Sequence, residues 1–355
     1  MRILDLYIGR IIASTTFITL MVFVSVSGII KFVEQMRAVG RGNYDLAHAA
    51  LYVLYAVPRD VEIFFPMSAL IGGLIGIGML ASNSELVVMQ AAGLSRFDII
   101  KSVMKTAFIL IIISMSIGEW LAPSGEERAR EIRAQAISGG SLISANNGVW
   151  AKDGDYFVNI GEVLEQGQLK KVQIYRFNEK LKLESWLSAE TARYQNEAWL
   201  LEGVIDTRLE NKKIQTEKYD QQVWKSSLTP EKLGVVTVTP ESLSIRGLVD
   251  YLDYLEANDQ DSSRYQLAFW RKLMQPITVA VMLLVALSFI FGPLRSVSMG
   301  ARIMMGVFTG ILFFVCNEVL GSLSLVYQFP PILGAMMPSV LFVSVSWYFI
   351  SKKST

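Results

Sequence analysis

Six long apolar runs constrain this chain more than any other feature of its sequence. They span residues 11–30, 63–84, 99–122, 273–294, 303–325 and 331–350. The hydrocarbon core of a bilayer is about 30 Å thick, so a helix needs about 20 consecutive, mostly apolar residues to cross it. The sequence therefore predicts an α-helical membrane protein with six transmembrane helices. The first run is too long for a secretory signal and lacks a small-residue cleavage site, so we interpret it as a retained span.

Charged residues are concentrated in the middle of the chain. The sequence holds 33 Lys and Arg and 32 Asp and Glu residues, and its net charge of +1 gives no sign of a nucleic-acid-binding protein. The segment from Pro123 to Lys272 contains 20 basic and 23 acidic residues, which leaves few charges for the apolar runs. A single cysteine, Cys316, excludes an internal disulfide, and a single histidine, His48, excludes the usual zinc clusters.

The distribution of Lys and Arg predicts the orientation, because these residues favour short cytoplasmic loops. With the N-terminus inside, the cytoplasmic segments hold nine of them: Arg2, Arg10, Arg96, Lys101, Lys105, Arg295, Arg302, Lys352 and Lys353. The outer loop 327–330 holds none, so the sequence favours cytoplasmic N- and C-termini. The outer segment 31–60 departs from the rule with Lys31, Arg37, Arg41 and Arg59. Either its acidic residues neutralise these cations or the segment binds an anionic ligand.

The polar segment 124–263 predicts an external domain between the third and fourth spans. Short β-branched and aromatic runs separated by turn signals indicate strands at 156–160, 172–177, 183–187, 199–207 and 223–227. An all-β sandwich of about 100 residues fits this pattern. Segment 125–135 has the character of a charged helix that extends the third span, and 243–255 predicts a helix capped by Ser242 or Ser244.

These patterns divide the chain into three parts. Residues 1–123 hold three spans and a short cytoplasmic helix at about 84–92. Residues 124–263 form the β domain with its helical connectors, and residues 264–355 hold the last three spans.

The sequence lacks the common motifs of nucleotide binding and catalysis. A G-x-x-x-x-G-K-[ST] phosphate loop, an H-E-x-x-H zinc pair and a G-x-S-x-G nucleophile elbow are all absent. Gly72 with Gly76, and Gly306 with Gly310, have instead the spacing that lets membrane helices approach closely, within this chain or with another subunit.

Two carboxylates, Glu119 and Glu318, fall near the outer ends of the third and fifth spans. Charge at membrane depth is costly and often functional, so proton coupling has to be weighed against structural pairing or solvated helix ends. Their position near an interface favours the structural interpretation. A lipid-modifying enzyme that uses Glu119, Glu318 and Asp60 or Glu62 as acid and base is an alternative function, although these residues form no cluster in the sequence.

The loop between the second and third spans predicts a short helix from Glu85 to Ala92. The preceding Ser82-Asn83-Ser84 offers capping side chains, and Glu85 suits the positive end of a helix dipole. Ser95 and Asp98 then have the spacing of a capping box for the third span. The short helix carries Glu85, Leu86, Val87, Met89 and Gln90. It either rests on the membrane surface or docks a cytoplasmic protein.

Two cations mark the end of the first span. Lys31 and Arg37 are six residues apart, which is nearly two helical turns, so they lie on related faces. Phe32, Val33 and Met36 lie beside them. The cations either reach the phosphate headgroups of the bilayer or hold an amphiphile with an acidic head and apolar tails.

Five segments are specific enough to compare with known families. They are Ser-Gly-Ile-Ile-Lys-Phe-Val at 27–33, Ser-Glu-Leu-Val-Val-Met-Gln at 84–90, Arg-Ala-Gln-Ala at 133–136, Val-Trp-Ala-Lys-Asp-Gly at 149–154 and Leu-Ser-Phe-Ile-Phe-Gly-Pro-Leu-Arg at 287–295. Together they resemble the lipopolysaccharide-export permeases, and the resemblance covers essentially the whole chain.

The resemblance implies a permease half with a periplasmic β-jellyroll, located in the inner membrane of a Gram-negative cell. It implies a heterodimer with the paralogue LptF, an ATPase dimer of LptB and a contact with LptC. The cargo would be lipopolysaccharide, extracted from the inner membrane and passed to a periplasmic bridge. The chain itself would be non-catalytic and free of cofactors, with ATP and Mg²⁺ bound by the partner ATPase.

The resemblance also assigns residues. It places Glu85 and its helix against the ATPase, and it assigns Lys31 and Arg37 to the lipid phosphates. The family has a further lysine directly after the second basic position, where this chain has Ala38; Arg41 is the candidate to compensate. The first helix is expected to border a lateral gate and the transmembrane helix of LptC. A purely structural anchor for the β domain remains a third hypothesis.

Overall fold

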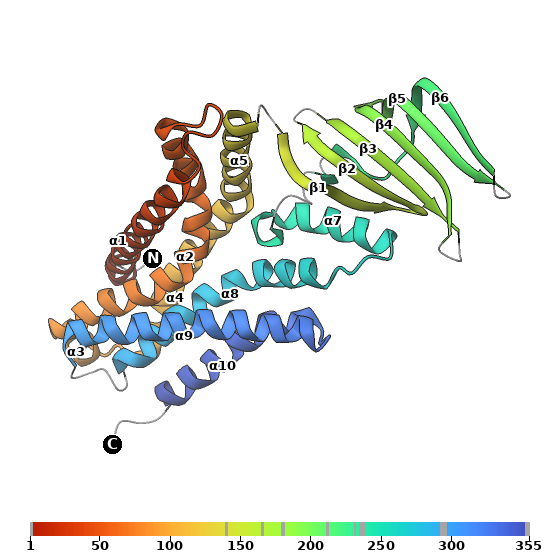
Figure 1. The fold of residues 1–355 in the computed structure, drawn as a ribbon. Coiled ribbons are helices and arrows are strands. Elements are labelled where there is room, and N and C mark those ends of the chain that lie inside the picture. The colour runs from red at the N-terminus through yellow and green to blue at the C-terminus, as the bar shows by residue number, and fades with distance from the viewer. Residues whose placement is uncertain are drawn as a thin grey trace. The chain divides into compact units, whose positions relative to one another are not determined.

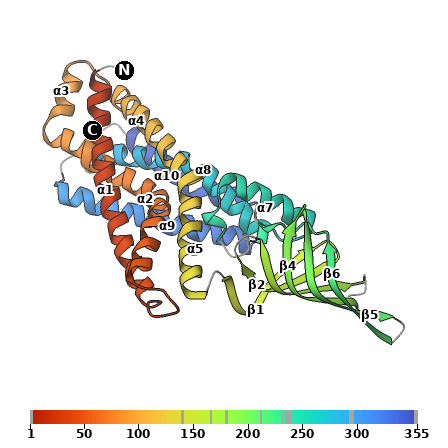
Figure 2. The same ribbon diagram turned by 90° about the horizontal axis from the view of Figure 1, so that it is seen from above.

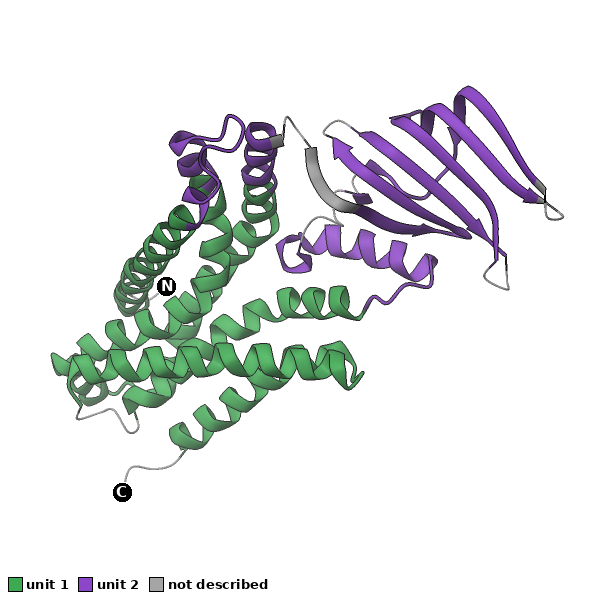
Figure 3. Cartoon of the chain, viewed as in Figure 1, with its two compact units in different colours: residues 1–33, 53–126, 263–355 green, residues 34–52, 127–262 purple. Residues whose placement is uncertain are grey.

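The computed structural model describes residues 3–138, 141–164, 167–178, 182–210, 213–230, 232–233, 239–291 and 297–351. Arg2, Arg295, Lys352 and Lys353 of the orientation argument lie outside these residues. The chain forms two compact units, which Figure 3 colours separately. Unit 1 comprises residues 1–33, 53–126 and 263–355, and unit 2 comprises residues 34–52 and 127–262.

Long helices follow the six apolar runs (Figure 1). Their bounds are α1 Ile3–Met36, α2 Leu46–Ser82, α4 Arg96–Ser116 with the π-helical turn η1 Ile117–Leu121 and α5 Ala122–Ser138, α8 Ser263–Phe291, α9 Met299–Val326 and α10 Pro331–Ser351. When α4, η1 and α5 are counted as one segment, these are six segments, and each is long and apolar enough to cross a membrane. The prediction of six membrane helices is therefore confirmed.

Glycines set the close contacts of α2 with its neighbours. A Cβ atom at Gly72 would lie 2.4 Å from the Cα atom of Thr16 in α1. At Gly310 of α9 it would lie 2.9 Å from Met67 of α2, and at Gly306 it would lie 2.6 Å from Leu74. The glycine spacing thus marks helix contacts within this chain.

The short helix α3 spans Glu85–Ala91, close to its predicted limits. The predicted side-chain cap is wrong, because Ser84 adopts a left-handed conformation with φ 63° and its side chain makes no capping hydrogen bond. The capping box of α4 is confirmed: the Asp98 backbone N–H donates to Ser95 Oγ, and the Ser95 N–H donates to Asp98 Oδ2.

Unit 2 contains one six-stranded antiparallel sheet whose strands pair in sequence order. The strands are β1 Ser141–Asp153, β2 Tyr156–Leu164, β3 Gln168–Phe177, β4 Leu183–Gln195, β5 Ala198–Glu210 and β6 Lys213–Trp224. The all-β character of the insert is confirmed, and the described strands form a meander within a single sheet. The sequence analysis missed β1. It also placed the last strand at 223–227, whereas β6 covers Lys213–Trp224. Polar residues in β1 and β6 concealed both strands.

Alternation along the strands gives the sheet a buried face. Val158 and Ile160 of β2 and Val172 and Ile174 of β3 all point to that face, and none is more than 5% exposed. Helix α7, Ile245–Ala257, begins with Ser244 as its cap, which confirms one of the two predicted caps. Figure 2 shows α7 beside the sheet, and the Tyr254 hydroxyl donates to the Lys152 carbonyl at 2.7 Å. Burial raises the pKa of Tyr254 to about 12.

A compact loop in unit 2 joins α1 to α2. Tyr44 is 2% exposed, and its hydroxyl donates to Gln35 Oε1 at 3.1 Å. Asp45 begins α2 by accepting the His48 backbone N–H at 2.9 Å, and this hydrogen bond is the main reason that the pKa of Asp45 is lowered. The segment that carries Arg37 and Arg41 is therefore an ordered turn.

Candidate functional site

Lys31 of α1 pairs with Asp60 of α2. The Lys31 Nζ and Asp60 Oδ1 atoms are 2.7 Å apart. The Asp60 side chain is only 3% exposed, whereas that of Lys31 is 27% exposed. Asp60 Oδ2 is buried and has no hydrogen-bond partner among the described residues. The pair thus presents its cation outward and keeps its anion inside, which leaves the Lys31 ammonium accessible to an anion.

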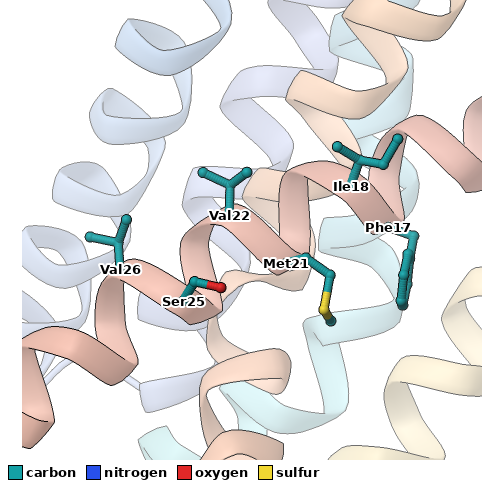
Figure 4. A pocket seen from close by; sticks show the side chains of 6 residues that line it. All are labelled: Phe17, Ile18, Met21, Val22, Ser25 and Val26. Carbon is teal, nitrogen blue, oxygen red and sulfur yellow. The ribbon is translucent and has the colours of Figure 1, made fainter.

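The surface of α1 beside this pair is apolar and open. Figure 4 shows one stretch of it, a shallow hollow lined by Phe17, Ile18, Met21, Val22, Ser25 and Val26. Phe17 is 59% exposed, and Ile29 and Ile30 nearer to Lys31 are 66% and 55% exposed. In a membrane protein such a surface contacts lipid chains or another helix. The first helix therefore combines an accessible cation with an apolar face.

The other predicted lipid-binding residues differ in exposure. Phe32 is half-buried, and Met36 at the end of α1 is 46% exposed. Arg37 and Arg41 are exposed in the turn that follows, which belongs to unit 2. Ala38 is 4% exposed, so a longer side chain at this position would require the turn to rearrange.

A second charged cluster, which the sequence did not predict, surrounds Glu62 of α2. Arg59 Nη1 lies 2.7 Å from Glu62 Oε2, and Lys272 Nζ of α8 lies 3.3 Å from Glu62 Oε1. The side chains of Glu62 and Lys272 are 5% and 7% exposed. A Cβ atom at Gly118 in η1 would lie 2.8 Å from the Glu62 carboxylate, so glycine is needed there. The consecutive cations Arg271 and Lys272 at the start of a membrane helix were the sequence signal for this cluster.

The remaining carboxylates also have basic neighbours. Arg271 Nη1 lies 3.2 Å from Glu318 Oε2, and Arg271 donates to the Asn317 carbonyl at 2.7 Å. Glu119 interacts electrostatically with Lys272. Glu318 therefore lies in an ion pair, as Asp60 and Glu62 do, and Glu119 lies within electrostatic reach of Lys272. Carboxylates held in ion pairs are poorly suited to act as the acid and base of a lipid-modifying enzyme.

Helix α3 divides the predicted docking residues between two faces. Leu86 and Met89 are 5% and 9% exposed and belong to the apolar core of unit 1. Val87 is 56% exposed, and Gln90 is exposed as well. Val88, which we did not predict as a docking residue, is 66% exposed. The outward face of α3 therefore consists of Val87, Val88 and Gln90, and the inward pair anchors the helix.

Glu85 is tied to the first helix. The Tyr7 hydroxyl donates to Glu85 Oε2 at 2.8 Å, and Asn83 Nδ2 donates to Glu85 Oε1 at 3.4 Å. Close by in sequence, Asp5 of α1 accepts from Lys105 Nζ of α4 at 2.6 Å. These contacts join the start of α1 to α3 and α4.

Six apolar helices long enough to cross a membrane, a β unit inserted after the third and a short helix between the second and third define a multi-pass membrane protein with an inserted β domain. The family model for the lipopolysaccharide export system permease LptF/LptG matches residues 6–352, so the chain belongs to this family.

Curated relatives agree with the family assignment. The chain is 50% identical to the lipopolysaccharide export system permease protein LptG of Escherichia coli strain K12, over 99% of both chains. It is 49% identical to the LptG protein of Haemophilus influenzae, over 99% of this chain and 98% of the relative. The E. coli LptF protein is 28% identical over 26% of this chain and 25% of its own. The similarity to LptG thus extends over the full length, and the similarity to LptF covers a part.

Proposed function

We propose that this chain is the LptG-type permease subunit of an ATP-driven lipopolysaccharide exporter in the inner membrane of a Gram-negative cell. Its termini face the cytoplasm, and its β unit faces the periplasm. It pairs with LptF, binds an LptB dimer and LptC, extracts lipopolysaccharide from the membrane and passes it to the periplasmic bridge. Similarity to LptG over the full length and the distribution of cations support this proposal.

The observation that carries the proposal is the outward cation of the Lys31–Asp60 pair. A buried carboxylate holds the lysine ammonium at the surface of an apolar helix, where an acidic headgroup and acyl chains could bind together. Phe32 and Met36 supply further apolar surface, and Arg37 and Arg41 supply further cations. A phosphorylated lipid with several acyl chains matches this combination.

Energy for extraction has to come from a partner. Removing a lipid from a bilayer costs about 0.8 kcal/mol for each buried methylene group, and this sequence has no phosphate loop. We propose that LptB, with ATP and Mg²⁺, docks on α3 through Glu85, Val87 and Gln90. Leu86 and Met89 hold α3 in place from the inside.

The docking proposal is tested by copurification. The wild-type chain should retain LptF, LptB and LptC, and Glu85→Lys should lose LptB while LptF stays bound. Ser82→Ala is a matched control, because Ser82 is an exposed neighbour whose hydroxyl donates to the Met79 carbonyl and not to Glu85. Retention of LptB by Glu85→Lys would refute the assignment of α3.

The cargo proposal is tested by crosslinking to lipopolysaccharide. Lys31→Asp combined with Arg37→Asp should lower both crosslinking and the lipid-stimulated ATP hydrolysis of the complex severalfold. Lys101→Asp, an exposed lysine of α4, serves as the control. Wild-type crosslinking and ATP hydrolysis in the double variant would mean that these cations only contact lipid headgroups. A purified chain that converts a lipid unaided would support the enzyme alternative.

A further inference from the structure

Three aromatic side chains form a row across the β sheet. They are Trp150 of β1, Tyr175 of β3 and Trp186 of β4, and we call them the aromatic row. The ring centroids of Trp150 and Tyr175 are 5.6 Å apart. Those of Tyr175 and Trp186 are 6.3 Å apart, and their planes differ by only 4°. Trp150 is 58% exposed and Trp186 is 38% exposed, so the row is open to solvent.

The strand register places the row on the face of the sheet opposite the core. Phe157, Tyr175 and Trp186 are direct partners in neighbouring strands, and Val158 and Ile174, the next residues along, point to the buried face. Trp199 of β5 shows how this unit uses a tryptophan for packing: it is fully buried, and its indole donates to the Leu228 carbonyl at 2.7 Å. The rings of the aromatic row instead stack on one another across the strands, and both tryptophans remain partly exposed.

The surroundings of the row are polar but largely uncharged. Asn159, Gln173 and Ser188 follow Trp150 across the sheet in register. Gln173 Oε1 accepts the Tyr175 hydroxyl at 2.7 Å, which orients the carboxamide beside the rings. Lys152, in register with Phe157, directs its ammonium to the Asn258 carbonyl at 3.0 Å. Hydrogen-bonding side chains predominate beside the rings, so the face suits a ligand that is rich in hydroxyl groups.

Flat rings beside carboxamides and hydroxyls fit a sugar. The C–H face of a hexose carries weak positive charge and is attracted to the negative face of an aromatic ring. Its hydroxyl groups both donate and accept hydrogen bonds, as carboxamides do. An acyl chain would instead need an enclosed apolar cavity to be buried. Sheet faces of small β domains are known to bind oligosaccharides.

We propose that the aromatic row binds hexose rings in the saccharide part of the exported glycolipid. The sugar chemistry follows from the row itself, and the choice of glycolipid rests on the proposed function. Another source of the same chemistry, a soluble cell-wall glycan, is separated by the experiment.

The test compares two lipopolysaccharides that differ only in their saccharide. The full-length chain, copurified with its partners in nanodiscs, is titrated with lipopolysaccharide that carries a complete core saccharide and with a form truncated after the innermost sugars. The wild type should bind the complete form about tenfold more tightly, which corresponds to about 1.4 kcal/mol. Trp150→Ala with Trp186→Ala should abolish this difference and leave binding of the truncated form unchanged.

Tyr219→Ala is the matched control, because Tyr219 is a 41% exposed aromatic residue of β6 in register with Val204, outside the row. It should keep the tenfold preference. Equal binding of both lipids by the wild type, or a preference that survives in the double variant, would overturn the proposal. So would competition by a soluble cell-wall glycan but not by the free core saccharide. If the wild type binds neither lipid, the proposed function itself fails.

Discussion

Helices α1 and α2 are both long and apolar, but they have different surroundings. In their most apolar 18-residue windows, 17% of α1 and 67% of α2 is buried. Helix α2 contacts α1 and α9 through glycine-mediated packing and holds Asp60 and Glu62 in ion pairs. Helix α1 has a few polar contacts, at Asp5, Tyr7 and Lys31, separated by exposed apolar surface. The comparison indicates that α2 is the packed scaffold and that α1 presents an exposed apolar surface.

The largest effect should come from the buried charges of the scaffold. Lys272→Met leaves Glu62 with one cation fewer in the interior, and breaking a buried pair costs about 3–5 kcal/mol. Thermal unfolding of the purified complex should reveal this loss. The control Lys101→Met removes an exposed lysine and should change stability little.

A second substitution measures how strongly the charges of Lys272 and Glu62 are coupled. Lys272→Met combined with Glu62→Gln should cost less stability than the sum of the two single changes, because the pair between these residues is removed only once. If Lys272→Met alone is as stable as the wild type, the ion pair does not hold α2 and α8 together, and the scaffold role of α2 is weakened.

A substitution at the contact between α1 and α2 should cause the next largest loss of stability. Gly72→Ala would place a Cβ atom 2.4 Å from the Thr16 backbone, and overpacking of this kind costs about 1–3 kcal/mol. Gly28→Ala is the matched control, since its Cβ atom would meet only Val53 at 3.6 Å. Crosslinking of α1 to α2 through introduced cysteines would report the separation. Equal crosslinking of α1 to α2 in the two variants would contradict the close packing at Gly72.

A smaller effect is expected where α1 meets α3. Tyr7→Phe removes only the hydroxyl that holds Glu85, and one hydrogen bond contributes about 1 kcal/mol net. If Glu85 must be oriented to bind LptB, the affinity for LptB should fall about fivefold, which corresponds to about that energy. Tyr327→Phe, at a 64% exposed tyrosine after α9, is the control. An unchanged affinity would show that Tyr7 does not position Glu85.

The smallest expected effect is the pH dependence of stability at the first turn of α2. The pKa of Asp45 is lowered, chiefly because its carboxylate accepts the His48 backbone N–H. Its contribution is therefore complete above the pKa of an unfolded aspartate and is lost as pH falls through the lower folded value. Hydrogen exchange of the first amides of α2, corrected for intrinsic rates, should accelerate in that acidic range. Asp45→Asn should flatten this dependence, and an unchanged profile would contradict the capping role.

Local patterns predicted most of the fold. The helices follow from the apolar runs, and the Ser95–Asp98 box and the Ser244 cap follow from short-range hydrogen bonding. The missing side-chain cap at Ser84 escaped prediction because the sequence does not show its left-handed conformation. In that conformation the Ser84 side chain makes no capping hydrogen bond with the helix. The strands β1 and β6 escaped because polar residues hide their alternation, and pairing with a neighbouring strand decides their extent.

The candidate sites were predictable in part. Lys31 and Glu85 stood out because each is a charge beside apolar residues. Their partners, Asp60 and Tyr7, are 29 and 78 positions away, and no spacing rule connects them. The same limit applies to the aromatic row, whose members come from three strands and meet only through the register.

The sequence by itself determined that this chain has six segments long and apolar enough to cross a membrane and carries a β insert, because these properties depend on composition and local period. Tertiary structure alone decided which charge neutralises which, which face of α3 is free and which aromatic residues share a surface. The physical reason is that ion pairs and packing act over a few ångströms in space, and sequence position does not fix distances between separate helices or strands.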